Sequence, residues 1–395
     1  MKIKFKKFQT LYRFDYFLLL ITPLVDSING LFLINNEQSS ISIGSIYRIV
    51  LIVYILMNLL ASSKLFFTIL PFAYFPFDGV FRGLLGSNLI GTLTYSIKWI
   101  LPFVLIIYYS FSKKNKKEIK NCLIRCLDIW CYFVPISLII EYIFGIGKLT
   151  YYDAGFKGLY YSTNDIALAL IVLFIYSVYM SYDKDKKYLI SSLLNFIAII
   201  ILSTKSSLIF SVVVFIYLSI MFGKINWKKL ITSVALSVLV FVLIKSTFSS
   251  QVDAVVLRYS NMWENTSNDN FISRFLSFAT SGRTDRIEKF FTLANIGNVV
   301  TNYLFGWIYP DNAHVIEMDW HDLICQYGVI GFFIVFFEYL YLLIKSNLNS
   351  KPYNIIIVIC IIYSIFAGHV ISGAFAGTVF ATVFSILILN NCKIN

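Results

Sequence analysis

The chain has little charge for its length and few residues suited to metal or disulfide chemistry. Of its 395 residues only 14% are Asp, Glu, Lys or Arg, and there are three histidines and six cysteines. The cysteines all lie in or beside apolar segments, without the spacing of a disulfide framework or a zinc site. We therefore expect no disulfide scaffold, no metal and no cofactor.

Hydrophobic residues are what the chain has in excess. They make up 58% of the sequence, which contains 37 Phe and 27 Tyr. A soluble core cannot bury so much apolar surface, so we expect an all-α, polytopic membrane protein. The formal net charge of +12 would suggest a nucleic-acid partner in a soluble protein. Here most lysines lie in short runs between apolar spans, so no nucleic-acid partner is predicted.

Long apolar runs predict about twelve transmembrane helices in one transmembrane domain that covers residues 1–395. The run at residues 65–81 is short and contains Pro71 and Pro76. The expected spans are residues 14–34, 43–61, 65–81, 86–111, 122–145, 164–182, 187–203, 206–222, 229–248, 320–345, 353–371 and 372–391.

Basic residues predict how these helices are oriented. With a cytoplasmic N-terminus, every lysine-rich connection falls on the cytoplasmic side, as the positive-inside rule requires. Asp26 and Asn29 stand where a signal peptide would need small residues, so we expect the first helix to be retained. Both termini are then cytoplasmic, and residues 249–319 form one large extracytoplasmic loop with short helices. The lysine-rich connections contain Lys64 and residues 113–120, 184–187, 224–229 and 345–351.

Polar residues gather on the predicted outer side. Lys157 and Asn164 lie in or just after the connection that follows residue 148, and Lys205 lies at the outer end of a tight hairpin. A cation so close to hydrocarbon costs on the order of a few kcal/mol unless it pairs or snorkels to the headgroups. Lys205 is therefore either a functional residue or a lysine that snorkels to the headgroups. Lys157 also fits an ordinary loop lysine.

Few charged residues lie inside the predicted spans. Lys98, Glu141 and Lys245 look scattered along the sequence. His369 follows a glycine in an apolar helix, where a hydrogen-bonded core histidine is expected.

Arginines in the large loop are candidates for binding an anion. Arg283 and Arg286 are three residues apart and share a face if the segment is helical, and Arg274 lies in the same loop. Their forked guanidinium groups suit a phosphate or diphosphate. The alternative is a solvated amphipathic helix in which Asp285 and Glu288 neutralise the arginines.

The end of the large loop offers candidates for a general base. His314, Glu317 and His321 share one face if the segment is helical, with Asp319 and Asp322 on another. Burial and neighbouring acids can lift the pKa of a carboxyl toward neutrality, which a base requires. Two alternatives remain: these residues cap the next helix, as Asp322 could, or two histidines and Glu317 bind a metal, although further strong ligands are missing.

The order of short motifs resembles the O-antigen polymerase and ligase superfamily over residues 148–337. The motifs are an outer loop that leads into an Asn-started helix, a Leu-Ser-x-basic-Ser hairpin, a Ser-Gly-Arg in the large loop and a terminal Tyr-Gly-Val-Ile-Gly. In this chain they are Gly158 to Asn164, Leu202 to Ser206, Ser281 to Arg283 and Tyr327 to Gly331.

The resemblance implies a class C type glycosyltransferase of the bacterial plasma (inner) membrane. Wzy-type polymerases of this family join undecaprenyl-diphosphate-linked oligosaccharide repeat units into O-antigen, capsule or exopolysaccharide at the outer face, whereas ligases pass the finished chain to an acceptor. It also implies contact with membrane lipids and partnership with flippase and chain-length regulator proteins. In the family the basic hairpin residue and the loop arginine hold the donor diphosphate, and by motif these are Lys205 and Arg283.

The chain departs from the family pattern at two positions, and the second departure favours a polymerase over a ligase. Lys205 stands where the family commonly has arginine, which replaces a fork with a point charge. Ligases place a His-Asn pair about eleven residues before a glycine, and the equivalent position, counted back from Gly328, is Glu317. We expect Glu317, helped by Asp319 or His321, to deprotonate the acceptor sugar hydroxyl in an inverting transfer.

The remaining candidates are expected to bind the diphosphate or the glycan. The full predicted binding set is Arg283, Arg286, Lys205, Arg274, Asn164, Lys157 and His314. A flippase or other transporter is the alternative from a different class. It is disfavoured because the two halves show no matching helices broken by Gly or Pro.

Overall fold

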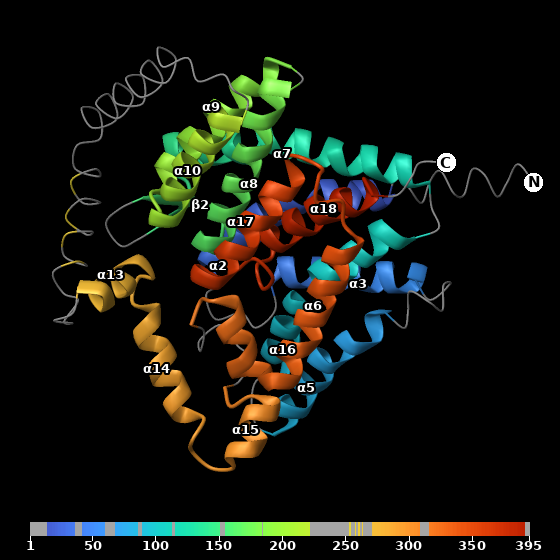
Figure 1. The fold of residues 1–395 in the computed structure, drawn as a ribbon, viewed down its shortest axis with the longest axis vertical. Coiled ribbons are helices and arrows are strands. Elements are labelled where there is room, and N and C mark those ends of the chain that lie inside the picture. Colours follow the sequence, from blue (N-terminus) through green and yellow to red (C-terminus); the bar gives the residue numbers. More distant parts are fainter. Residues whose placement is uncertain are drawn as a thin grey trace, which may run out of the picture. The chain divides into compact units, whose positions relative to one another are not determined.

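The computed structural model describes most of the chain as helix, which confirms the all-α class (Figure 1). The predicted helix 229–248, much of residues 249–270, His314 and the first thirteen residues lie outside the described residues. The described segments are residues 14–35, 42–59, 68–85, 89–112, 115–150, 155–183, 185–221, 271–308 and 316–391, with positions 253, 257, 260 and 263.

Each predicted span within these segments contains helix, with a break at residues 367–374. Among the described residues, four helices are long and apolar enough to cross a membrane, and a fifth span is added if Phe14–Leu20 and Thr22–Leu33, which are bent by 47° relative to each other, form one span. The chain is therefore a helical protein of membrane type, while the number twelve and the orientation stay predictions. The four are α6 (Leu89–Phe111), α7 (Lys116–Phe144), α8 (Thr163–Asp183) and α16 (Asp319–Lys345).

The other apolar helices are shorter. Near Pro71 the predicted span 65–81 contains a 3-10 turn, η1 (Leu70–Ala73), followed by α5 (Tyr74–Leu84). The remaining ones are α2 (Thr22–Asn35), α3 (Ile43–Leu59), α9 (Lys187–Leu202), α10 (Lys205–Met221), α17 (Tyr353–Phe366) and α18 (Phe375–Leu389).

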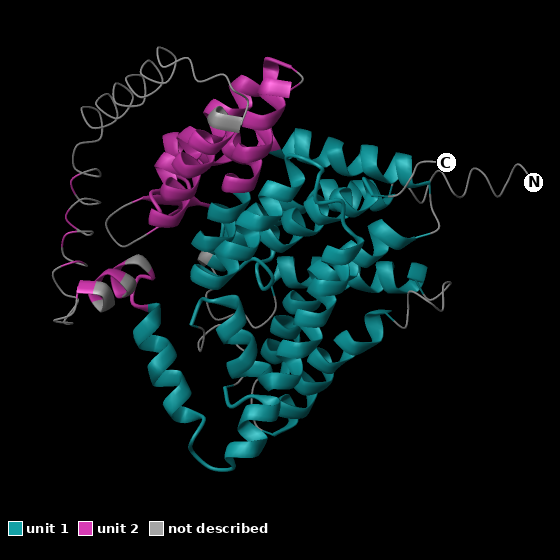
Figure 2. Ribbon diagram, viewed as in Figure 1, with its two compact units in different colours: residues 1–130, 160–169, 283–395 teal, residues 131–159, 170–282 magenta. Residues whose placement is uncertain are grey.

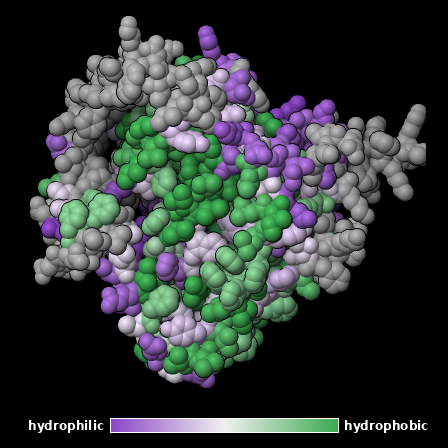
Figure 3. Space-filling view, viewed as in Figure 1, coloured by the Kyte–Doolittle hydropathy of each residue, from purple (hydrophilic) through white to green (hydrophobic). Residues whose placement is uncertain are grey.

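Hydrophobic side chains are exposed over a broad part of the visible face in Figure 3. Exposed large residues recur on single helices, as with Phe333 and Phe337 on α16 and Val358 and Phe366 on α17. A soluble protein does not leave continuous apolar surface of this kind open to water. These residues are placed as lipid contacts would be.

The chain divides into two compact units, which Figure 2 colours separately. Unit 1 comprises residues 1–130, 160–169 and 283–395, and unit 2 comprises residues 131–159 and 170–282. The division runs through the predicted large loop between Gly282 and Arg283. Each unit is described by itself below.

The core of unit 1 is built around α6, which packs against α3, α5 and α18. Trp99, Phe103 and Val104 of α6 are completely buried, and so are most side chains of α18. At Gly377 of α18 a Cβ atom would lie 2.9 Å from the Pro102 ring, so only glycine allows this close crossing.

A break separates α17 from α18. The sequence predicts helix up to residue 371, but α17 ends at Phe366 and α18 begins only at Phe375. Gly368 (φ 64°) and His369 (φ 60°) adopt the left-handed conformation, which a right-handed helix cannot continue through. The prediction of helix through residues 367–371 and at residues 372–374 was wrong for this reason.

The Tyr-Gly motif marks a second break, inside α16. Gly328 has φ 65°, and a Cβ there would lie 2.2 Å from the carbonyl oxygen of Leu304 on α15 (Val299–Phe305). The backbone of α15 therefore approaches α16 where only glycine fits. The close approach of α15 therefore explains why a glycine is needed in the Tyr-Gly motif.

Unit 2 contains the hairpin α9–α10 and a small sheet. Strands β1 (Lys148–Leu149) and β2 (Phe156–Gly158) pair antiparallel. The Thr150 hydroxyl donates to the Leu202 carbonyl at 2.9 Å, which fixes the end of β1 to the end of α9. The α9–α10 turn passes through Ser203 in the left-handed region, at φ 56°.

Candidate functional site

The described part of the large loop contains three short helices. They are α13 (Phe271–Ala279) in unit 2 and α14 (Arg283–Leu293) and α15 in unit 1. Short helices were predicted in this loop, and its extracytoplasmic location stays a prediction. Ser281 (φ 56°) and Gly282 (φ 75°) form the left-handed turn between α13 and α14.

A small hydrophobic core fixes α14 against the start of α16. The Trp307 indole N–H donates to the Phe290 carbonyl at 2.7 Å, and the Trp307 and Ile308 amides donate to the Cys325 carbonyl at 2.8 and 3.0 Å. This packing places the first turn of α14 beside the residues that precede α16. The core consists of Ile308, Ile316, Met318 and Cys325, with Ile287, Phe290, Phe291 and Trp307 packed against it.

Two of the predicted arginines meet the predicted base. The Arg283 guanidinium donates to a Glu317 carboxylate oxygen at 2.8 Å, and a nitrogen of Arg286 lies 4.0 Å from the other oxygen. The Arg283 side chain is only 11% exposed, whereas that of Glu317 is 35% exposed. The two arginines share a helical face, as the sequence predicts, and both lie beside Glu317.

Glu317 is held as a carboxylate. Burial raises the pKa of the Glu317 carboxyl, but the Arg283 guanidinium, then His369 and Arg286, outweigh burial and hold this pKa below its usual range. We expected burial and neighbouring acids to lift it toward neutrality, and that expectation was wrong because two arginines lie beside it. A carboxylate stabilised in this way is a poor proton acceptor.

The backbone of Glu317 is fixed from one side by Asp322. The Asp322 carboxylate accepts the amide N–H groups of Ile316, Glu317 and Met318 at 2.6, 3.0 and 3.1 Å. Capping by Asp322 was one of the expected alternatives, and these bonds have that character. Glu317 itself has φ 69° and precedes the helix. The sequence pattern predicted that Glu317 shares a helical face with His321. That prediction was wrong, because Glu317 lies before the helix begins.

Asp319 fixes the break between α17 and α18. Its carboxylate, which is fully buried, accepts the amides of His369, Val370 and Ile371 at 2.9, 2.8 and 3.1 Å. It also accepts the Ser372 hydroxyl at 2.8 Å. These four donors occupy the carboxylate, which gives Asp319 a positioning role.

His369 joins the site although the sequence analysis assigned it to the core. A Cβ atom on Gly368 would lie 2.4 Å from the Glu317 carbonyl oxygen, so the two turns are in direct contact. The imidazole interacts electrostatically with the Glu317 carboxylate. A Gly-His pair inside an apolar run was the available signal, because glycine there permits a turn that helix does not.

Lys205 and Arg274 have partners within unit 2. The Lys205 ammonium donates to the Phe278 carbonyl at 3.1 Å and lies 3.7 Å from the centre of the Phe278 ring. The Arg274 guanidinium donates twice to the Trp263 carbonyl, at 2.9 and 2.7 Å, and lies over the Trp263 ring. Both cations are thus bound to neutral groups around α13.

The other predicted binding residues are more dispersed. Lys157 lies in β2, where burial and the nearby Lys148 charge lower the pKa of its ammonium group. Asn164 lies in the first turn of α8 and belongs to unit 1. His314 lies outside the described residues. A meeting of Lys157, Lys205 or Arg274 with Arg283 stays a prediction, because the first three belong to unit 2.

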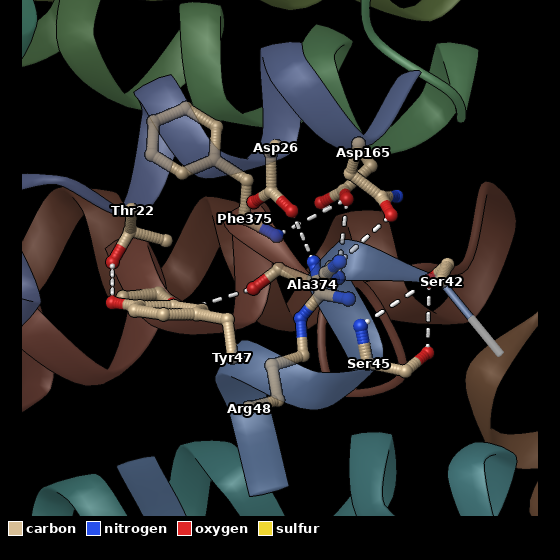
Figure 4. Close-up of polar contacts among 12 residues, drawn as sticks. Thr22, Asp26, Ser42, Ser45, Tyr47, Arg48, Asp165, Ala374 and Phe375 are labelled. Carbon is tan, nitrogen blue, oxygen red and sulfur yellow. Dashed lines mark hydrogen bonds and ion pairs between the residues drawn. The ribbon is translucent and has the colours of Figure 1, made fainter. Parts of the chain in front are cut away.

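Buried charges gather inside unit 1 (Figure 4). Arg48 forms an ion pair with Asp26, and Lys98 interacts electrostatically with Arg48, Asp165 and Asp26. The Asp165 carboxylate accepts the first amides of α18, from Ala374, Phe375 and Ala376. Lys98 looked scattered in the sequence, but in the structure it lies near other charged groups. Glu141 in unit 2 accepts the Leu159 amide at 2.9 Å, and Lys245 lies outside the described residues.

Within the part of the chain that the structure describes, no three His, Cys, Asp or Glu side chains form a possible metal-ligand set. Comparison with known proteins found no matching family model, no matching curated protein and no matching solved structure.

Proposed function

We propose that this protein is a Wzy-type glycosyltransferase, which joins undecaprenyl-diphosphate-linked oligosaccharide repeat units into a polysaccharide at the outer face of the bacterial plasma membrane. One observation carries the proposal. A nearly buried arginine and a second, exposed arginine flank an ionised carboxylate at the end of the large loop. The order of the sequence motifs supports the same conclusion.

In this proposal the arginines hold the donor. Forked guanidinium groups bind diphosphate oxygens through pairs of charge-assisted hydrogen bonds. Arg283 is restrained by the packing of α14 and already holds one anionic group, the Glu317 carboxylate. A diphosphate carries more charge than a carboxylate and competes for the same donors. Fixed cations then stabilise the leaving diphosphate without a metal ion.

The acceptor sugar would bind on the Glu317 side of the arginines. Its hydroxyl attacks the anomeric carbon, the bond from that carbon to the lipid diphosphate breaks, and configuration inverts in a single displacement. Glu317 is 35% exposed and so remains accessible to a sugar hydroxyl. Asp319 contributes by holding the turn that carries His369.

Polymer length in cells tests this proposal. Cells whose only copy carries Arg283→Ala or Glu317→Gln should lose long polymer and accumulate single lipid-linked repeat units. Lys289→Ala is the matched control, because Lys289 is an exposed cation on the same helix. It should give wild-type chain lengths at equal membrane abundance. Wild-type polymer from both Arg283→Ala and Glu317→Gln would contradict the assignment.

A transporter is the second candidate, supported by a specific observation. The charge cluster of Asp26, Arg48, Lys98 and Asp165 lies within the helices of unit 1, and Asp165 holds the start of α18 at a helix break. Buried charges at broken helices are typical of transport sites. Deletion separates the two functions: repeat units trapped on the outer leaflet indicate a lost polymerase, and units trapped on the inner leaflet indicate a lost flippase.

A further inference from the structure

Two aspartates at the start of α16 each organise a separate turn. Asp322 binds three consecutive amides of residues 316–318, and Asp319 binds three consecutive amides of residues 369–371. The first turn carries Glu317 and the second carries His369. One helix terminus therefore fixes two backbone turns, whose residues Glu317 and His369 lie 52 positions apart in the sequence (369 minus 317).

Both side chains stand on left-handed backbone. Glu317 has φ 69° and His369 has φ 60°. Among the described residues, the other non-glycine positions with positive φ are Ser203 and Ser281. Such conformations persist where the surroundings impose them, and they concentrate at functional sites. Here the surroundings are two buried carboxylates and the direct contact of Gly368 with the Glu317 carbonyl.

We propose that His369 is the catalytic base of the glycosyl transfer and that the charge of Glu317, on the adjoining turn, stabilises the imidazolium that forms. The inference rests on the proposed function and names a residue within that site. One oxygen of Glu317 accepts a hydrogen bond from Arg283, and an Arg286 nitrogen lies 4.0 Å from the other, so two cations stabilise the carboxylate form. Imidazole is a common proton acceptor in catalysis, and a neighbouring carboxylate favours the imidazolium that forms.

The step balances within the site. An imidazole nitrogen of His369 takes the proton of the acceptor hydroxyl while that oxygen bonds to the anomeric carbon. The bond between the anomeric carbon and the diphosphate oxygen breaks, and both electrons leave with the lipid diphosphate, which the arginines hold. The imidazolium, beside Glu317, then passes its proton to water, which restores the neutral base.

Two variants test this in the full-length protein, reconstituted in lipid vesicles with lipid-linked repeat units extracted from cells that lack the gene. His369→Asn retains tolerance of positive φ but cannot accept a proton at neutral pH. His369→Gly keeps the turn and leaves room for free imidazole. Both should lose roughly 100-fold or more in kcat, with a smaller change in KM for the lipid-linked unit. Added imidazole should restore part of the rate of His369→Gly and none of that of His369→Asn.

A purely structural role would not respond to imidazole. Wild-type kcat in His369→Asn, or no rescue of His369→Gly, overturns the proposal, as does loss of activity on His321→Asn with full activity of His369→Asn. If the variants do not accumulate, acylation of the wild-type protein with diethyl pyrocarbonate provides the test. Activity should fall in step with modification mapped to residue 369, and full activity with that residue acylated overturns the assignment.

The same assay separates this inference from the proposed function. If wild-type protein makes no polymer, the function fails and the inference falls with it. If wild-type protein polymerises, Arg283→Ala does not, and His369→Asn keeps the wild-type kcat, the function stands and the assignment of His369 alone fails.

Discussion

Two sets of predicted cations are held in physically different ways. In unit 1 Arg283 is paired with a carboxylate, so its charge is compensated until another anion takes that place. In unit 2 the contacts of Lys205 and Arg274 include carbonyl groups and aromatic rings, which are electrically neutral. A basic residue in the sequence therefore corresponds to an ion pair with a carboxylate in one place and to contacts with carbonyl groups and aromatic rings in the other.

The difference extends to how each region is built. The turns around Glu317 depend on the buried carboxylates of Asp319 and Asp322, which bind runs of backbone amides. The Lys205 contact depends on one carbonyl and one ring face of α13. Removing a carboxylate should therefore disturb unit 1 far more than removing the ammonium group disturbs unit 2.

The largest effect is expected from Asp319→Asn. The side-chain nitrogen of asparagine cannot accept a hydrogen bond. At least one of the buried donors among residues 369–372 therefore loses its acceptor and faces the N–H groups of the asparagine side chain instead. Each such group costs about 1–3 kcal/mol, and we expect a loss of ~3 kcal/mol or more. The thermal midpoint of the detergent-solubilised protein measures it. Glu288→Gln removes a charge from an exposed position on α14 and should leave the midpoint unchanged. Equal midpoints for both variants would refute the positioning role of Asp319.

A smaller effect is expected from Lys205→Met, which keeps the hydrophobic stem and removes the charge. It loses one hydrogen bond to a carbonyl and one cation–π contact. Together these contribute about 1–2 kcal/mol. If Lys205 also meets the donor diphosphate, KM for the lipid-linked unit should rise by roughly tenfold, and Lys205→Arg should keep the wild-type KM. An unchanged KM in Lys205→Met would leave this lysine with its structural contact only.

The smallest effect is an acid dependence of the Arg283–Glu317 pair. The pKa of Glu317 is lower in the folded protein than its ordinary value of 4.5. The pair therefore contributes its full stability above about pH 4.5, and this contribution is lost as the pH falls through the lowered folded value. Glu317→Gln lacks the pair at every pH. The midpoint difference between wild type and Glu317→Gln should shrink between pH 6 and pH 3, and a constant difference would contradict the ion pair.

Helices were predictable because apolar runs of the right length leave few alternatives. The break at residues 367–374 was not, because its own residues are mostly apolar and small. The carboxylate that stabilises it belongs to Asp319, 50 positions earlier (369 minus 319). Hydrophobic pattern is local, whereas a backbone turn held by a distant acid is a tertiary interaction.

The sequence predicted individual residues of the candidate site but not the ion pair between them. The sequence pointed to Arg283 for an anion and to Glu317 for a base, each from its neighbours. Their ion pair depends on the packing of α14 against α16, which no spacing in the sequence reports. The contact also reverses the expected direction of the Glu317 pKa. His369 was missed for the same reason, because its partners come from a different segment.

The most direct measurement is chain growth by purified protein in vesicles supplied with lipid-linked repeat units. Wild-type protein and Lys289→Ala should produce a ladder of products, each one repeat unit longer than the last. Arg283→Ala, at equal abundance in the vesicles, should leave the starting unit unextended. A full ladder from Arg283→Ala, or no ladder from the wild type, would contradict the account.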